Sequence, residues 1–327
     1  MAVLDGRLPD DRLPVIEWAS WWDLTLKRWH GEGLSPALGG DALFDALGLD
    51  VHRQFWLAHT APDCPAPARQ GGPLIENADD YGRLKPYLYP KTANDRAFEA
   101  MRAAEAEHRA GKTVIWFSLD GGFWFPRRLF GIEGHLYAFY DEPELYRRIL
   151  DDLADFQLSQ LEKIYSICTP EFMTFAEDMS YNLGPMISEA LFDKFLLPYY
   201  RRVVPYIRAR GTKVICDSDG DITKMIPWMK RAGIQGVLPL ERQAGVDLNA
   251  IRAEHPDFLL IGGFDKMVMK RGEAAMRAEF ERLLPVMRSG GYIPSVDHQT
   301  PPDVSLETYG IYVGLLKEYA ERAAAGQ

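Results

Sequence analysis

The chain has 327 residues, with 37 Lys and Arg against 47 Asp and Glu, and a formal net charge of −10. This acidic balance argues against nucleic acid or an anionic membrane surface as the main partner. No run approaches the roughly 20 apolar residues that span a bilayer, and residues 1–12 lack the apolar core of a signal peptide. The 3 widely spaced cysteines are an odd number, which favours a reducing compartment, so we expect a cytoplasmic protein.

The first 110 residues have weaker patterns than the rest of the chain. We predict a strand at 14–18, helices at 21–30 and from Asp41, and a helix at 94–110. The stretch 61–92 is rich in Pro and Gly, which predicts a long surface loop.

Five tryptophans lie close together in this part of the sequence: Trp18, Trp21, Trp22, Trp29 and Trp56. Such residues serve either as core packing or as the aromatic lining of a site for a flat ligand. The sequence leaves both interpretations open.

From residue 113 the chain alternates between strands and helices. The predicted strands are 113–117, 171–176, 213–216, 236–240, 259–263 and 291–296. The predicted helices are 145–166, 189–210, 222–232, 248–255, 272–288 and 305–322. This alternation predicts parallel strands joined by right-handed crossovers, and six such units suit an eight-stranded barrel better than an open sheet. We therefore predict an α/β protein with one domain, 1–327: a (β/α)₈ TIM barrel, with 1–110 as an N-terminal helical and loop elaboration and 111–322 as most of the barrel.

Every predicted strand from residue 113 onward ends in ionisable residues. They are Asp120, Glu177, Asp178, Asp217, Asp219, Glu241, Asp265, Lys266, Asp297 and His298. The carboxyl ends of barrel strands form the active site in enzymes of this fold. Any single Asp here could be a turn or helix cap, but six acidic ends together indicate a site. Carboxylates crowded in one mouth repel each other unless cations or protons balance them.

A metal ion is one way to balance these charges. Asp217 and Asp219 are two residues apart and share a face of an extended chain. With Glu241 and His298 they would form an oxygen-rich set with one nitrogen ligand, which suits Mg²⁺, Mn²⁺ or Zn²⁺ but not a thiolate zinc site. Cys216 is out of phase with them and is expected to be buried filler.

Substrate contacts are predicted from aromatic and charged residues near the same strand ends. These residues are Trp18, Trp22, Trp124, Glu177 and Lys266. Predicted catalytic residues are Asp120, Asp178 and His298.

Several short segments carry a family resemblance. They are Phe123-Trp124, Gly131-Ile132-Glu133, Asp141-Glu142-Pro143-Glu144-Leu145, Glu177-Asp178-Met179, Leu197-Pro198-Tyr199-Tyr200, Asp217 to Gly220, Ile261-Gly262-Gly263-Phe264-Asp265 and Gly291 to Pro302. In these segments the chain resembles the uroporphyrinogen decarboxylase superfamily, which includes the decarboxylase of haem biosynthesis and methyltransferases that exchange methyl groups with corrinoid proteins. The resemblance covers residues 110–320 well and the first hundred loosely. It implies a TIM-barrel enzyme with a small-molecule substrate, a corrinoid protein as a candidate partner, and a homodimer.

The departures from the family pattern narrow the chemistry. Methyltransferases of the family that activate a thiol end the corresponding strand in His-x-Cys-Gly, and a later Cys completes their zinc site. This chain is an Asp-Ser-Asp-Gly variant, with Asp217, Asp219 and His298 at those positions. His298 resembles the histidine at the same strand end in the decarboxylase. The Arg-Gln-Ala-Gly-Arg signature that grips propionates there is missing near the N-terminus, and the late Arg242 to Gly245 stretch is a coincidence.

Three functions remain in competition. The first is methyl transfer from an O-methyl substrate, aromatic or not, to a corrinoid protein, with a metal acting on the ether oxygen. The second is decarboxylation of a tetrapyrrole or a smaller carboxylated substrate, with Asp120 or Asp178 stabilising a protonated intermediate and His298 positioning or protonating it. The third is a non-catalytic barrel that binds a ligand.

Overall fold

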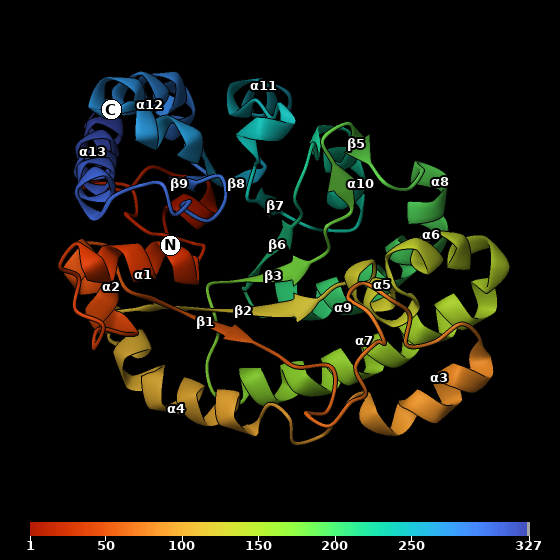
Figure 1. Cartoon of the computed structure of the whole chain (residues 1–327). Helices are drawn as coiled ribbons and strands as arrows, with labels where there is room; N and C mark the ends of the chain where they lie inside the picture. Colours follow the sequence, from red (N-terminus) through yellow and green to blue (C-terminus); the bar gives the residue numbers. More distant parts are fainter. Residues whose placement is uncertain (326–327) are drawn as a thin grey trace.

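Seven parallel strands form one curled sheet in the computed structural model, which describes residues 1–325 (Figure 1). Their order in the sheet follows the sequence: β1 (His52–Trp56), β2 (Val114–Asp120), β3 (Phe172–Ala176), β6 (Lys213–Asp217), β7 (Gly236–Leu238), β8 (Leu259–Phe264) and β9 (Tyr292–Val296). Two further strands, β4 (Ser180–Tyr181) and β5 (Gly184–Pro185), make a small antiparallel hairpin after β3.

The strand register fixes where the strand ends lie. Asp120 pairs with Ala176, and Ala176 pairs in turn with Asp217. On the other side of the sheet Phe264 pairs with Val296. The residues that follow these strands therefore leave the sheet at the same edge, which is the carboxyl edge of a parallel sheet.

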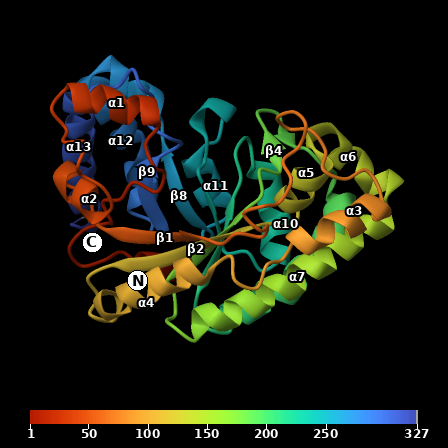
Figure 2. The ribbon, with the colours of Figure 1, turned by 60° about the horizontal axis from the view of Figure 1, so that its bottom comes forward.

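Helices follow the strands and cover the outside of the sheet (Figure 2). The α-helices are α1 (Asp23–Gly31), α2 (Asp41–Leu47), α3 (Ala78–Leu84), α4 (Asp95–Arg109), α5 (Trp124–Phe130), α6 (Ile132–Asp141), α7 (Pro143–Tyr165), α8 (Glu189–Leu191), α9 (Leu197–Arg208), α10 (Ile226–Arg231), α11 (Leu248–Glu254), α12 (Glu273–Met287) and α13 (Leu306–Ala324). The shorter helical turns are Val3–Asp5, Lys85–Tyr87, Phe192–Leu196, Thr223–Met225, Arg242–Ala244 and Lys266–Arg271.

An extended segment, residues 13–19, lies between β9 and β1 without forming a ladder with either. The backbone N–H of Val15 donates to the Asp50 carboxylate at 2.9 Å instead of to a strand. The N–H of Trp18 donates to Ser295 Oγ at 3.3 Å, and His52 Nε2 lies 2.9 Å from the carbonyl oxygen of Glu17. Side chains thus hold this segment where an eighth strand would stand.

The α/β class and the parallel sheet are confirmed, and the predicted strands from residue 113 onward all occur. The curled sheet is consistent with the predicted (β/α)₈ TIM barrel, but the seven strands do not close it. The segment predicted as a strand at 14–18 bonds to side chains and leaves the sheet open there. Strand β1 was not predicted as a strand, and the predicted loop at 61–92 contains helix α3. One hydrophobic cluster extends from Val3 to Ala323. No helix within residues 1–325 combines the length and the apolar character needed to cross a membrane.

Candidate active site

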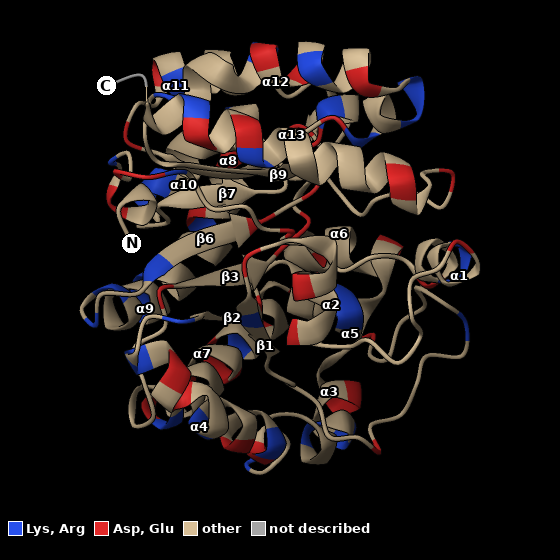
Figure 3. Cartoon of the chain, turned by 90° about the vertical axis from the view of Figure 1, so that its left-hand side faces the viewer, with Lys and Arg blue, Asp and Glu red and all other residues tan. Residues whose placement is uncertain are grey.

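The carboxyl edge of the sheet gathers acidic side chains from three consecutive segments. Figure 3 shows Asp and Glu at the ends of several strands near the centre of the molecule. Asp178 follows β3, Asp217 ends β6, and Glu241 follows β7. The predicted convergence of these residues is therefore present in the structure.

Asp217 is the innermost acid of the group. Burial first, then the nearby charges of Asp178 and Asp219, raise the pKa of Asp217 well above its ordinary value. Asp178 has a left-handed backbone, with φ 44°, and its Oδ1 atom accepts the Asp219 backbone N–H at 3.3 Å. Burial also raises the pKa of Asp178. The two residues are thus held in a group that favours protonated carboxyls.

Asp219 is an acid of this group that solvent can reach. Burial, with Asp178 and Glu241 as the main charged neighbours, raises the pKa of Asp219 to about 7. Its side chain retains 40% exposure, and its Oδ2 atom lies 3.8 Å from Nε2 of His298. Burial and then Lys266 lower the pKa of His298, which favours a neutral imidazole. Near neutral pH the pair therefore consists of a carboxyl group that holds a proton part of the time and a neutral histidine.

The loop that carries Asp219 is fixed by backbone contacts. Oε2 of Glu241 accepts the N–H of Gly220 at 2.8 Å. Gly220 has φ 82°, and a Cβ there would lie 2.6 Å from the Cα of Tyr181, so only glycine fits this approach. These contacts hold the acidic turn against the β4–β5 hairpin.

Lys266 is a cation at this edge of the sheet, and it is bound within the protein. Its Nζ atom lies 3.2 Å from Oδ1 of Asp297 and 2.9 Å from Oε1 of Gln243. Asp297 is fully buried, and this burial raises its pKa to about 6. The predicted substrate contact of Lys266 remains a prediction; in this structure the ammonium group balances Asp297.

Glu177 was predicted to contact substrate, but its carboxylate is fully buried. It accepts backbone N–H groups from Gly122 at 2.9 Å, Phe123 at 2.7 Å and Trp124 at 3.1 Å, and also the hydroxyl of Tyr200. Burial raises the pKa of Glu177 to about 7 despite these donors. The contacts make Glu177 the anchor of the turn that begins α5.

Asp120 was predicted to be catalytic and lies on the α5 side of the mouth. Its carboxylate pairs with Arg128, and Oδ2 lies 3.6 Å from Nδ1 of His59. Burial lowers the pKa of His59, which favours the neutral ring. Asp120 therefore belongs to an arginine-containing cluster with Arg128 and His59.

The predicted tryptophan contacts fall in three places. Trp18 donates its Nε1–H to the Val296 carbonyl at 2.7 Å and packs edge-on against His298, with ring centroids 6.3 Å apart. Trp22 is 41% exposed at the start of α1. Trp124 carries the guanidinium of Arg127 over its ring at 5.1 Å. Trp18 is the tryptophan that directly adjoins the acidic mouth.

The predicted metal set shares one mouth but is not assembled as a cage. Among residues 1–325, no group of three or more His, Cys, Asp or Glu side chains is placed to hold a metal ion. The donor types of Asp217, Asp219, Glu241 and His298 suit a hard divalent ion, and Nε2 of His298 lies 3.8 Å from Oδ2 of Asp219. The predicted metal site thus stays a prediction. Cys216 is fully buried, as predicted.

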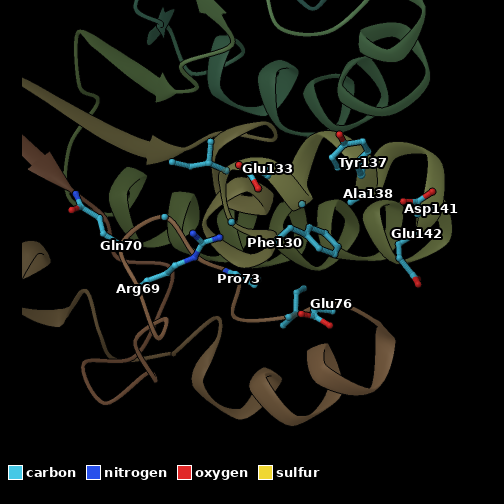
Figure 4. A pocket seen from close by; sticks show the side chains of 15 residues that line it. Arg69, Gln70, Pro73, Glu76, Phe130, Glu133, Tyr137, Ala138, Asp141 and Glu142 are labelled. Carbon is cyan, nitrogen blue, oxygen red and sulfur yellow. The ribbon is translucent and has the colours of Figure 1, made fainter.

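Two cavities lie along the segment between β1 and α6. One of about 680 Å³ is lined by residues from 58–74 and from helix α5. The other, of about 490 Å³, lies between residues 69–76 and α6, where Figure 4 shows Glu76, Glu133, Asp141 and Glu142 around it with Arg69. The second cavity is rich in acidic residues, whereas Arg127 and Arg128 line the first.

Sequence reasoning left three groups near the site without a role. Asp297 was recognised as a strand end, but its pairing with Lys266 depends on two loops meeting. Arg127 follows Trp124 by three residues, a helical spacing that could have indicated their stacking. Glu17 is buried in the segment between β9 and β1, bonded to Ser295 at 2.8 Å, and burial raises its pKa to about 8.

The chain was compared with known proteins. The family model "Uroporphyrinogen decarboxylase (URO-D)" matches residues 67–319, whereas no curated protein matches. A methyltransferase from Methanosarcina mazei has a similar structure, with TM-score 0.68, 15% identity and 97% coverage of both chains. A putative vitamin-B12 independent methionine synthase from Listeria monocytogenes gives TM-score 0.47, 11% identity and coverage of 97% and 96%. A B12-independent methionine synthase from Shewanella sp. W3-18-1 gives TM-score 0.41, 9% identity and coverage of 67% and 66%. At these identities the structural likeness concerns the fold, and the family match over most of the sequence shows that this chain belongs to the uroporphyrinogen decarboxylase (URO-D) family.

Proposed function

We propose that this chain is an enzyme that transfers a methyl group from an O-methyl substrate, aromatic or not, to a corrinoid protein. The observation that carries the proposal is the carboxyl group of Asp219, with its pKa raised to about 7 and its side chain 40% exposed beside His298. A carboxylic acid that keeps a proton near neutral pH is a suitable general acid.

An ether oxygen is a poor leaving group unless it gains a proton or an equivalent positive charge. In the proposed reaction the methyl carbon–oxygen bond breaks and its electron pair stays on the oxygen. The methyl group passes to the reduced cobalt of the corrinoid, and the oxygen takes the proton of Asp219 to leave as an alcohol or phenol. Burial, with the charges of Asp178 and Glu241, raises the pKa of Asp219 and so favours its protonated form, and neutral His298 lies 3.8 Å from its carboxyl group.

The structural relative supports the reaction class by analogy only. The protein from Methanosarcina mazei is described as a methyltransferase, and it shares the fold along 97% of both chains. One fold hosts many reactions, so the weight of the proposal rests on the acidic mouth.

A divalent metal is kept in the proposal as a candidate ligand of the same acids. If bound, it would supply Lewis acidity to the ether oxygen. Because the described residues do not place three ligands together, we assign no step of the reaction to it.

The test is methyl transfer to free cob(I)alamin, used as a soluble substitute for the corrinoid protein. Methoxybenzene and 4-methoxybenzoate serve as donors, and methylcobalamin is the measured product. We expect activity in the wild type and a loss of about 10²- to 10⁴-fold in kcat for Asp219→Asn, which retains size but cannot give up a proton. Asp10→Asn, an exposed acid outside the mouth, is the matched control. Absence of methylcobalamin with both donors, or full activity in Asp219→Asn, would refute the proposal.

Decarboxylation is the second candidate, because a neutral carboxyl beside His298 could equally protonate a carbanion left after loss of carbon dioxide. The matching family model bears the decarboxylase name. Incubation with uroporphyrinogen under anaerobic conditions separates the two, since only a decarboxylase releases carbon dioxide. The non-catalytic alternative predicts that removing mouth carboxylates stabilises the fold and costs no activity in either assay.

A further inference from the structure

The cavity of about 680 Å³ has a composition that sets it apart from its surroundings. Its size is within the range of small-molecule sites. Its walls are mainly alanine, proline and other apolar residues from 58–74, with Trp124, Phe125 and Leu129 from helix α5. Two arginines, Arg127 and Arg128, supply its charge.

No acidic side chain lines this cavity, within the part of the chain that the structure describes. The neighbouring cavity of about 490 Å³ has four acids and one arginine in its wall. The two cavities at the opposite edge of the sheet, of about 510 and 460 Å³, also contain acids in their walls. In a chain with a net charge of −10, a cavity lined by two arginines and no acid favours an anionic ligand.

Arg127 is the arginine with free capacity. Arg128 is bound to Asp120, whereas Arg127 forms no ion pair with any residue in 1–325. Its guanidinium reaches the carbonyl oxygen of Asp178 at 3.5 Å, a weak contact, and otherwise lies over the ring of Trp124 at 5.1 Å. A guanidinium placed over an aromatic ring retains N–H donors at its edge, and these donors can bind a carboxylate.

Arg127 also connects this cavity with the acidic mouth, because it lines the cavity and its guanidinium contacts the backbone of Asp178. The backbone N–H of Trp124 donates to Oε2 of Glu177 at 3.1 Å. Glu177 and Asp178 both follow β3, so the same strand end positions Trp124 and the contact of Arg127. A carboxylate bound at Arg127 would therefore lie on the side of the cavity that is nearest to Asp178.

We propose that this cavity is a carboxylate-binding subsite, with Arg127 binding the carboxylate and Trp124 with the apolar walls contacting a flat organic body. The ligand class of this cavity would then be a flat organic acid. Carboxylate binding here is independent of any reaction, so it does not rest on the proposed function.

The test is direct binding, measured by isothermal titration calorimetry with benzoate as the probe. Benzamide has nearly the same shape without the charge, and phenyl phosphate tests whether another anion is accepted. We expect benzoate to bind at least 10-fold tighter than benzamide, and tighter than phenyl phosphate. Equal affinity for benzoate and benzamide, absence of benzoate binding, or a preference for phenyl phosphate would overturn the proposal.

Variants locate the site. Arg127→Met keeps the apolar stem and should weaken benzoate binding at least 10-fold while leaving benzamide unchanged. Arg127→Lys should recover part of the loss. Arg96 is exposed on helix α4, so Arg96→Met is the control and should bind like the wild type. Trp124→Leu should weaken both probes, since both stack on the ring. An unchanged benzoate affinity in folded Arg127→Met would overturn the assignment. Because the assay requires no turnover, failure of methyl transfer leaves this result standing, and the reverse also holds.

Discussion

The Nε2 atom of His298 lies 3.8 Å from the Oδ2 atom of Asp219, so the ends of two strands on different sides of the sheet meet in one pair. The pKa of Asp219 is raised to about 7 and that of His298 is lowered. Both shifts favour uncharged forms near neutral pH. An uncharged acid–imidazole pair in an otherwise acidic mouth is suited to proton transfer.

The first prediction concerns stability and pH. Because the folded pKa of Asp219 is above its ordinary value of 3.8, the stability it contributes is complete below that value and is lost as pH rises through about 7. We expect Asp219→Asn to exceed the wild type in free energy of unfolding by about 1 kcal/mol at alkaline pH, after allowance for solvent screening. Urea denaturation across pH measures this, and the difference should vanish in acid. A variant less stable than the wild type at alkaline pH would contradict it, and Asp10→Asn should show no such trend.

A second prediction concerns activity and pH. If Asp219 gives its proton to the leaving oxygen, the methyl-transfer rate should fall as pH rises through about 7. Asp219→Glu should keep a falling limb at a shifted position, whereas the residual rate of Asp219→Asn should be flat. The measurement is kcat against pH with saturating acceptor. A wild-type rate that rises through neutral pH would exclude Asp219 as the acid.

The third prediction concerns Glu177. Its carboxylate accepts three backbone N–H groups and the Tyr200 hydroxyl, and a glutamine would present its amide hydrogens to some of these donors. We expect Glu177→Gln to lower the free energy of unfolding by about 2–4 kcal/mol. Chemical denaturation measures the loss, and Glu99→Gln on exposed helix α4 is the matched control. Equal stability of the two variants would show that the anchor is dispensable.

The fourth prediction concerns divalent ions. Crowded carboxylates raise one another's pKa, so a cation among Asp217, Asp219 and Glu241 would relieve that repulsion and stabilise the folded state. We expect Tm to rise with added Mg²⁺, Mn²⁺ or Zn²⁺, and Asp219→Asn to respond less. Differential scanning calorimetry with a chelator-treated control checks this. An equal shift in both proteins would place the ion elsewhere, and no shift would remove the metal from the proposal.

The strands from residue 113 onward could be predicted from sequence because they are buried apolar runs between helices. Strand β1 could not, since His52 to Trp56 is only partly buried and carries no apolar run. The segment 14–18 has the alternation of a strand, yet Val15 and Trp18 bond to side chains. Alternation indicates an extended, half-buried chain, but it does not indicate the bonding partner.

The location of the site was predictable because parallel strands end at one edge, but the roles of its residues were not. Glu177 follows a predicted strand, as Asp219 does, but its carboxylate accepts hydrogen bonds from backbone N–H groups of the turn before α5. No residue type in the sequence indicates these backbone donors. Asp120 is neutralised by Arg128 from the next helix, and Asp297 by Lys266 from another loop. Such pairings decide which acids remain available, and they depend on tertiary contacts.

The seam between β9 and β1 has a consequence for the motions of the protein. Elsewhere the sheet is joined by ladders of backbone hydrogen bonds, whereas here a few contacts through Asp50, His52 and Ser295 hold the wall together. Because few backbone hydrogen bonds cross the seam, its amide groups should have low protection against hydrogen exchange. We expect local opening of the sheet to begin there. Trp18, which packs against His298, lies on this segment. Opening of this seam would therefore move Trp18 away from His298 and give solvent or a ligand access to the site.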